Sequence, residues 1–133
     1  MRQLDGRDLP KESAKGFATM RQAAMLGSPQ AQFYLGTKYE KGDGVPRELD
    51  RARRYFGLCA TQGIALCQYR LGSLLLDNPD RLERDYVQAV AWFQLAAGQG
   101  MSEAQQIATR ETANLTAAQT SWVNSLKGQL VRK

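Results

Sequence analysis

The sequence predicts an all-α protein in which helical hairpins stack into a short solenoid of about six helices, within one domain at residues 1–133. Two observations predict this fold. A motif of about 36 residues is written twice along the chain, and the apolar residues inside each copy recur with the spacing of an α-helix. One helix pair cannot bury its apolar stripe alone, so we expect repeated pairs to stack.

The repeat is found by shifting the sequence along itself. A shift of 36 residues places Leu35 and Gly36 on Leu71 and Gly72. A further shift of 37 residues places Ala52, Tyr55, Phe56, Ala60 and Gly63 on Ala89, Trp92, Phe93, Ala97 and Gly100. A weaker third copy follows, with Ala104 and Ala108.

Within the first copy, two helices are expected. Their apolar stripes at four-residue steps are Ala31, Leu35 and Tyr39 in one helix, and Ala52, Phe56 and Ala60 in the other. We expect Gly42 and Gly44 to end the first helix, because glycine adopts the backbone conformations of a sharp turn without strain. We expect Pro46 in the first turn of the helix that follows, and Asp85 as the N-cap at the matching place in the second copy.

These alignments predict the boundaries. Complete repeats are expected at residues 28–63 and 64–100, and a degenerate repeat with a C-terminal capping helix at 101–133. Residues 5–27 are expected to be the second half of a truncated repeat, because DGRDLPKE aligns with KGDGVPRE. Two interpretations stay open: a natural half-repeat cap, or a shortened or processed chain that has lost an upstream helix, with or without a signal peptide.

Composition excludes several classes of function. The net charge is +5, but basic and acidic residues are interleaved, and a basic stripe with aromatics is missing, so we expect no nucleic-acid partner. The chain has no His and only two Cys, which are too few ligands for a zinc site. Without His, a Ser-His-Asp or Cys-His catalytic arrangement is also impossible. We expect no metal, no cofactor and no insertion into a membrane.

The segment AQFYLGTKYEKGDGVPRELDRARRYFGLCATQG resembles a Sel-1-like repeat, a relative of the tetratricopeptide repeat. The resemblance covers about residues 6–130 and implies a right-handed α–α superhelix. The second copy departs from the family at Leu75, where Tyr is usual, and at Asn78 and Asp80, where Gly is usual. Because Asn and Asp tolerate left-handed backbone, we expect the turn to be kept with a changed loop.

The C-terminal segment NLTAAQTSWVNSLKGQL resembles the closing helix of such arrays. We expect Thr116 to be its N-cap. Trp122, Leu126 and Leu130 are expected to form its inner stripe, and Trp92 and Trp122 to lie in the core.

Cys59 and Cys67 lie on either side of an expected helix-to-helix turn. This spacing can bring the two Cβ atoms within disulfide range, and the cysteine-rich branch of the family resembles that arrangement. Alternatively both are small buried residues, since Cys67 aligns with Ala31 and Ala104. A disulfide would indicate a periplasmic or secreted location.

The first helices of stacked pairs line the concave face of a solenoid, its usual binding surface. If Leu35, Leu71 and Ala108 point into the core, residues two positions away face the groove. The candidate partner-binding residues are Phe33, Tyr69 and Gln106 in one row, Thr37, Ser73 and Arg110 in another, and Glu40 and Asp77 at a rim that could select a basic segment. The alternative for Phe33 and Tyr69 is packing against the neighbouring helix.

We expect a noncatalytic adaptor or scaffold that binds a segment of another protein in this groove. The resemblance places such proteins in bacterial envelope or secretion-related assemblies, here the periplasm if the disulfide forms and otherwise the cytoplasm. One alternative is an immunity or chaperone-like protein that blocks an effector. Another is the β-lactam-binding or β-lactamase-like activity described for cysteine-rich relatives, but Ser73 or Thr37 near Lys38 is its only remote nucleophile candidate. The oligomeric state is open.

Overall fold

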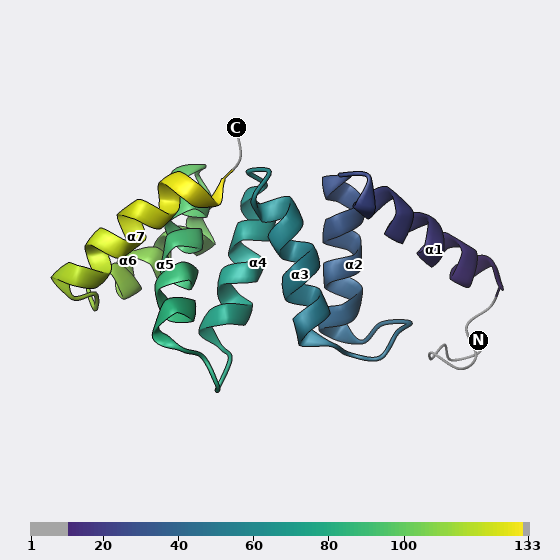
Figure 1. Ribbon diagram of the computed structural model, residues 1–133, viewed down its shortest axis with the longest axis horizontal. Helices are drawn as coiled ribbons and strands as arrows, with labels where there is room; N and C mark the ends of the chain where they lie inside the picture. Colours follow the sequence, from purple (N-terminus) through teal and green to yellow (C-terminus); the bar gives the residue numbers. More distant parts are fainter. Residues whose placement is uncertain (1–10, 132–133) are drawn as a thin grey trace. The chain divides into compact units, whose positions relative to one another are not determined.

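The computed structural model describes residues 11–131, with side chains from Gly16 onward. In this range the chain forms seven α-helices and no strand (Figure 1). They are α1 (Lys11–Met25), α2 (Pro29–Lys41), α3 (Leu49–Ala60), α4 (Ala65–Leu76), α5 (Glu83–Gly98), α6 (Ser102–Thr112) and α7 (Ala117–Leu130). The all-α prediction is confirmed, with one helix more than the approximately six expected.

The chain divides into two compact units, Met1–Cys59 and Ala60–Lys133, which are described in turn. The first holds α1, α2 and nearly all of α3, and the second holds α4 to α7. None of the helices in the described range is both long enough and apolar enough to cross a membrane.

In the first unit, α1 packs against α2 around a small apolar core. Ala24, Ala31 and Leu35 are buried there, and the side chains packed against them are Phe17, Met20, Ala23 and Tyr55. On its other side α2 meets α3 closely: a Cβ added to Gly36 would lie 2.8 Å from the ring of Phe56. A glycine at this position therefore allows the two helices to approach.

The loop between α2 and α3 begins as the two glycines predict. Gly42 has φ 70° and Gly44 has φ 82°, both in the left-handed region that glycine adopts without strain. The Gly42 N–H donates to the Lys38 carbonyl at 2.8 Å, which closes the last turn of α2.

Two predicted helix starts are wrong. Pro46 lies in the loop, because α3 begins only at Leu49. Asp85 is not an N-cap, because α5 already begins at Glu83. The Asp85 carboxylate instead accepts a hydrogen bond from the Leu82 N–H at 2.9 Å, from inside the first turn of α5.

In the second unit, α5 packs against α4, α6 and α7. A Cβ added to Gly72 of α4 would lie 3.1 Å from the ring of Phe93 on α5. On the face toward α7, Val87, Val90 and Ala91 form a buried cluster with Val123. The partly buried side chains around this cluster are Tyr86, Leu115, Leu126 and Leu130.

The loop between α4 and α5 differs from the prediction. No described residue other than glycine has a positive φ, so Asn78 and Asp80 do not replace the family's glycines in left-handed backbone. Asp77, which follows α4, has right-handed φ −84° and ψ −5°. The loop is held instead by side chains: Asn78 Oδ1 accepts from the Asp80 N–H at 3.0 Å, and Arg81 Nη1 donates to the Leu76 carbonyl.

At the C-terminus, the predicted cap is confirmed and part of the predicted stripe is wrong. The Thr116 hydroxyl accepts from the Gln119 N–H at 3.1 Å, and the Gln119 side chain accepts from the Thr116 N–H at 3.0 Å. Trp122 is 39% exposed, and the neighbouring Val123 takes the buried position. Trp92 is buried, as predicted.

Two buried glutamines, one on α2 and one on α4, were not predicted from the sequence. Gln32 and Gln68 occupy the same repeat position, and each is almost fully buried. The Gln32 amide donates to the Ala24 carbonyl at 2.9 Å, and the Gln68 amide donates to the Ala60 carbonyl at 3.2 Å. Each glutamine therefore ties its helix to the carbonyl eight residues before it, across a helix-to-helix turn.

Cys59 and Cys67 are both disulfide-bonded and neither is free, so the predicted disulfide is confirmed. Both side chains are fully buried.

Candidate partner-binding site

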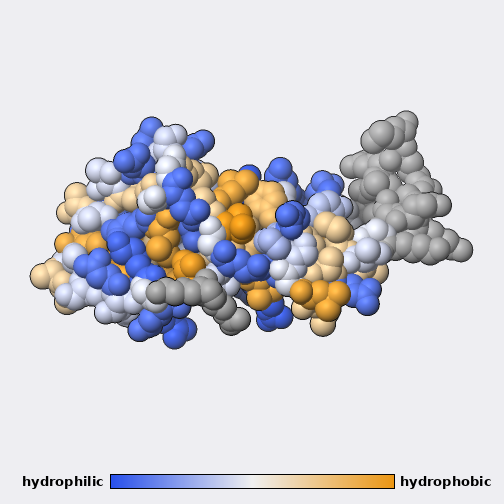
Figure 2. Space-filling view, turned by 90° about the horizontal axis from the view of Figure 1, so that it is seen from above, coloured by the Kyte–Doolittle hydropathy of each residue, from blue (hydrophilic) through white to orange (hydrophobic). Residues whose placement is uncertain are grey.

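On one face of the described residues, no single broad patch marks a site (Figure 2). On the face that Figure 2 shows, hydrophobic and hydrophilic residues are interspersed in several small patches. A candidate site must therefore be built from individual hollows and side-chain clusters.

Helix α2 carries three of the predicted site residues and is fixed at both ends. The Ser28 hydroxyl accepts from the Ala31 N–H at 3.2 Å, Pro29 is the first helical residue, and Gly42 ends the helix. Leu35 is fully buried, as expected. The face around Leu35 is therefore held in a defined orientation within the first unit.

Phe33 is half-buried, and its ring lies 5.8 Å from the ring of Phe56. Tyr69, at the same repeat position in the second unit, lies 5.9 Å edge-on from Phe93. Both aromatics therefore pack against the second helix of their own pair, while part of each side chain still reaches the surface. Thr37 donates its hydroxyl to the Phe33 carbonyl at 2.9 Å.

Phe33 and Thr37 both line an open hollow of about 470 Å³ in the first unit. The other lining residues are Met20, Gln30, Tyr34, Lys38, Lys41 and Asp43. Lys38 Nζ lies 5.1 Å from the centre of the Tyr34 ring and 2.9 Å from Asp43 Oδ2. The hollow, which we call the α2 hollow, therefore combines an apolar surface with cationic groups.

Tyr34, Lys38 and Lys41 were not among the predicted site residues, because the prediction took only positions two residues from Leu35. Tyr34 and Lys38 are four residues apart, a spacing that places side chains next to each other on a helix. That spacing is the sequence signal that could have found them. Glu40, which was predicted, does not line the hollow, and its backbone carbonyl accepts from Arg47 Nε at 3.0 Å.

Behind this face, aromatic rings stack through the first unit. The rings of Tyr39 and Tyr55 are nearly parallel with centres 5.8 Å apart, and Phe17 lies edge-on to Tyr39 at 5.9 Å. The Arg51 guanidinium lies over the Tyr39 ring, 5.5 Å from its centre. These contacts join α2 to α1 and α3 within the first unit.

In the second unit, the predicted residues lie on α4 and α6. Tyr69 and Ser73 are half-buried one turn apart on α4, and Asp77 is exposed directly after the helix. Gln106 and Arg110 are exposed one turn apart on α6. These residues therefore form two separate short rows, one along α4 and one along α6.

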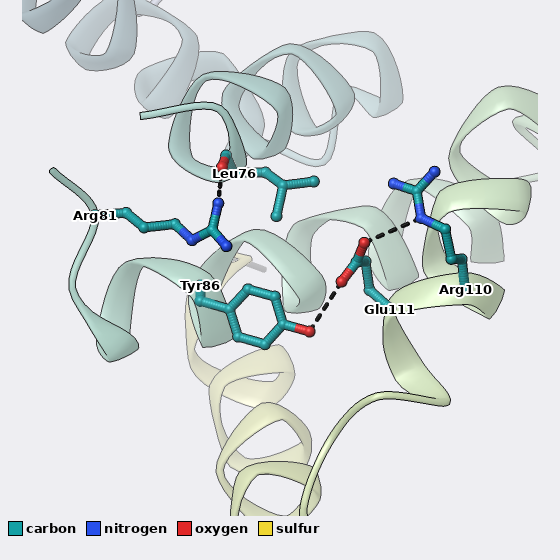
Figure 3. Close-up of polar contacts among 5 residues, drawn as sticks. All are labelled: Leu76, Arg81, Tyr86, Arg110 and Glu111. Carbon is teal, nitrogen blue, oxygen red and sulfur yellow. Dashed lines mark hydrogen bonds and ion pairs between the residues drawn. The ribbon is translucent and has the colours of Figure 1, made fainter. Parts of the chain in front are cut away.

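Arg110 belongs to a polar cluster that the sequence did not reveal (Figure 3). Arg110 Nε donates to Glu111 Oε2 at 3.0 Å, and Tyr86 donates its hydroxyl to Glu111 Oε1 at 2.9 Å. The Arg81 guanidinium lies 5.5 Å from the Tyr86 ring centre. Burial, and then the bond to Glu111, raise the pKa of Tyr86 above its ordinary value of 10.0. Tyr86 and Glu111 are 25 residues apart, so no local pattern predicts their contact.

The second unit also has two neighbouring hollows, of about 590 and 530 Å³, that share Gln94 and Lys127. None of the predicted site residues lines either hollow. Gln105, at the repeat position of Gln32 and Gln68, lines the second of them and is exposed. The hollow therefore opens where the third copy lacks the buried glutamine of the first two.

Comparison with known proteins supports one family. Residues 1–28, 29–64 and 65–101 each match the Sel1 repeat. No curated protein matches the chain significantly. Sel1 repeats are generally protein-interaction modules, and the fold is typically a noncatalytic scaffold.

Several solved structures are similar to this chain, and two of them are the following. One is a protective antigen present in uropathogenic Escherichia coli strains that displays an SLR fold, with 32% identity and a TM-score of 0.75 over 87% of this chain. This chain spans only 25% of that protein. The other is a Sel1 repeat protein from Oxalobacter formigenes, with 27% identity and a TM-score of 0.61, covering 72% of this chain and 71% of that one. The chain belongs to the Sel1 repeat family.

Proposed function

We propose that this chain is a noncatalytic adaptor that holds a segment of another protein on the exposed face of its first helices. The observation that carries this proposal is the α2 hollow. It combines a half-buried Phe33, a Tyr34 that is 39% exposed and two lysines, all on α2. Binding hot spots are enriched in aromatic side chains, Tyr among them, that a bound partner removes from water.

The surroundings of the only remote nucleophile candidate on α2 favour binding over catalysis. The Thr37 hydroxyl donates to the Phe33 carbonyl, and the Lys38 ammonium is paired with Asp43. A nucleophile needs a base within hydrogen-bond reach, and Lys38 is oriented toward Asp43 and Tyr34 instead. This engagement of both groups argues against a β-lactamase-like role for this pair.

We infer a location in an oxidising compartment such as the bacterial envelope, where the chain would act in an envelope or secretion-related assembly. The disulfide of Cys59 and Cys67 supports this inference, because cytosolic thiols are usually kept reduced. Measuring the redox state of both cysteines after rapid alkylation in producing cells tests it. Two alkylated thiols in the native host would contradict it.

Site-specific photocrosslinking in a native extract tests the adaptor proposal. A benzoylphenylalanine at position 34 lies in the α2 hollow, and the matched control carries it at position 54, where Arg54 is exposed on α3. We expect a discrete crosslinked protein from position 34 that position 54 does not give. Equal crosslinking from both positions, or products from position 54 alone, would contradict a site on α2.

A further inference from the structure

The α2 hollow has an unbalanced positive charge. Lys38 and Lys41 contribute two cationic groups, and Asp43 contributes one carboxylate. Asp43 is already engaged by Lys38 at 2.9 Å. Among the described residues Lys41 has no ion-pair partner, and it is exposed at the rim. An acidic group from outside the chain would pair with Lys41 there.

Part of the lining of the same hollow is apolar, and we call Met20, Phe33 and Tyr34 its floor. Met20 and Phe33 line it from α1 and α2, and the Tyr34 ring lies beside them. The Lys38 ammonium rests over the Tyr34 ring, so the cation is held next to the apolar surface. A ligand that places an apolar side chain on this floor would therefore bring its neighbouring groups close to both lysines.

The first unit, which contains the α2 hollow, also has a positive net charge. Residues 1–59 carry 11 Lys and Arg against 7 Asp and Glu, a net +4. Residues 60–133 carry 7 against 6, a net +1. Long-range attraction would therefore steer an acidic partner toward the first unit.

We propose that the α2 hollow binds an acidic protein segment that carries an apolar anchor residue. This inference rests on the proposed adaptor function and gives its partner a chemistry. It reverses the sequence-based expectation of a basic partner selected by Glu40, because Glu40 does not line the hollow. A protein segment is favoured over nucleic acid, because two lysines beside a methionine do not form the extended basic stripe that a phosphate backbone requires.

Fluorescence anisotropy with the whole chain and labelled eight-residue peptides tests the inference. One probe has Asp and Glu around a central Leu-Phe pair, a second has Lys and Arg around the same pair, and a third has Asp and Glu around Ser-Gly. We expect the first probe to bind at least about tenfold more tightly than the second. The third should bind more weakly than the first, because it lacks the apolar anchor, and sodium chloride should weaken the first.

Two matched charge-reversal variants test whether the acidic apolar probe binds at the α2 hollow. Lys41→Glu should weaken binding of the acidic apolar probe about fivefold to tenfold, because it removes one attraction and adds one repulsion. Arg54→Glu makes the same change of net charge on α3 and should weaken binding less than about twofold. Both residues are exposed, and circular dichroism would confirm that both variants fold.

The inference is overturned if the basic probe binds as tightly as the acidic apolar probe or more tightly, or if Lys41→Glu and Arg54→Glu lose binding equally. It is also overturned if no peptide binds up to millimolar concentration, or if a single-stranded octanucleotide binds more tightly than the acidic apolar probe. The adaptor proposal is tested separately. If the protein crosslinked from position 34 is retained in full by Lys41→Glu, the adaptor function stands and the acidic-segment inference fails.

Discussion

The helix pairs α2–α3 and α4–α5 share their internal contacts but leave their first helices by different means. Gly36 faces Phe56 in one pair and Gly72 faces Phe93 in the other. After α2 the chain turns through left-handed Gly42, whereas after α4 it turns through right-handed Asp77. The repeat therefore conserves helix-to-helix packing more strictly than it conserves the path of the loop.

The physical reason lies in what each feature must satisfy. A close approach of two helices leaves no room for a Cβ, so only glycine satisfies it. A helix end needs only partners for its last carbonyls, and these can come from backbone N–H groups or from side chains. In the second loop Arg81 donates to the Leu76 carbonyl, which gives this helix end a partner without a left-handed residue.

The largest change in stability is expected from substituting the buried Gln68. Gln68→Ala should lower the free energy of unfolding by about 2–3 kcal/mol, because it leaves the Ala60 carbonyl without this donor and opens a cavity. Gln105→Ala, at the same repeat position but exposed, should change it by less than about 0.5 kcal/mol. Urea unfolding measures both. Similar losses of stability in the two variants would contradict the claim that the buried glutamine contributes more than the exposed one.

The two glycine contacts are expected to differ. Gly36→Ala should cost about 1–2 kcal/mol, because its Cβ would lie 2.8 Å from a Phe56 ring that is itself fully buried, and the gain in helix propensity offsets only part of this. Gly72→Ala should cost less, because the Phe93 ring is 3.1 Å away. Gly128→Ala on α7 has open space and should stabilise by about 0.5–1 kcal/mol. Thermal unfolding of the three variants checks this order.

The two loops should respond differently to exchange of their key residues. Gly42→Ala should destabilise by about 1–2 kcal/mol, because its φ of 70° strains any residue with a Cβ. Asp77→Gly should not stabilise, because Asp77 is right-handed and glycine only adds freedom to the unfolded chain. A rise in the midpoint of chemical unfolding for Asp77→Gly would show that the second loop also prefers left-handed backbone.

The smallest effect concerns Tyr86 and depends on pH. Its pKa is raised in the folded chain, so the stability from its bond to Glu111 is fully present below pH 10.0 and is lost as the pH rises through the higher folded value. Tyr86→Phe should cost about 1 kcal/mol at neutral pH. Absorbance titration at about 295 nm should lose its most alkaline phenol in this variant. An unchanged titration curve would contradict the raised pKa.

Much of this fold could be predicted from the sequence, because the repeat shows which residues recur at helical spacing. Leu35, Phe56 and Trp92 fell on buried stripes as expected. Trp122 did not, since it lies next to Val123 and the pattern could not tell which of the two faced α5. The start of α5 was misplaced because Asp85 stabilises the helix from within its first turn.

The candidate site was less predictable. Counting two residues from Leu35 found Phe33 and Thr37, because the backbone geometry of a helix fixes which positions share a face. It missed Tyr34 and Lys38, whose pairing depends on side-chain direction rather than on the buried stripe. The contact of Tyr86 with Glu111 depends on tertiary packing, which repeat alignment does not contain.

The most direct test of the central claim is an amide chemical-shift map of the isotope-labelled chain bound to the partner that the intact chain captures. If the α2 hollow is the binding site, the largest shifts should fall on the amides of residues 29–43, and they should shrink in Lys41→Glu. Largest shifts around Gln94 and Lys127 would place the partner in the hollows of the second unit and contradict the claim.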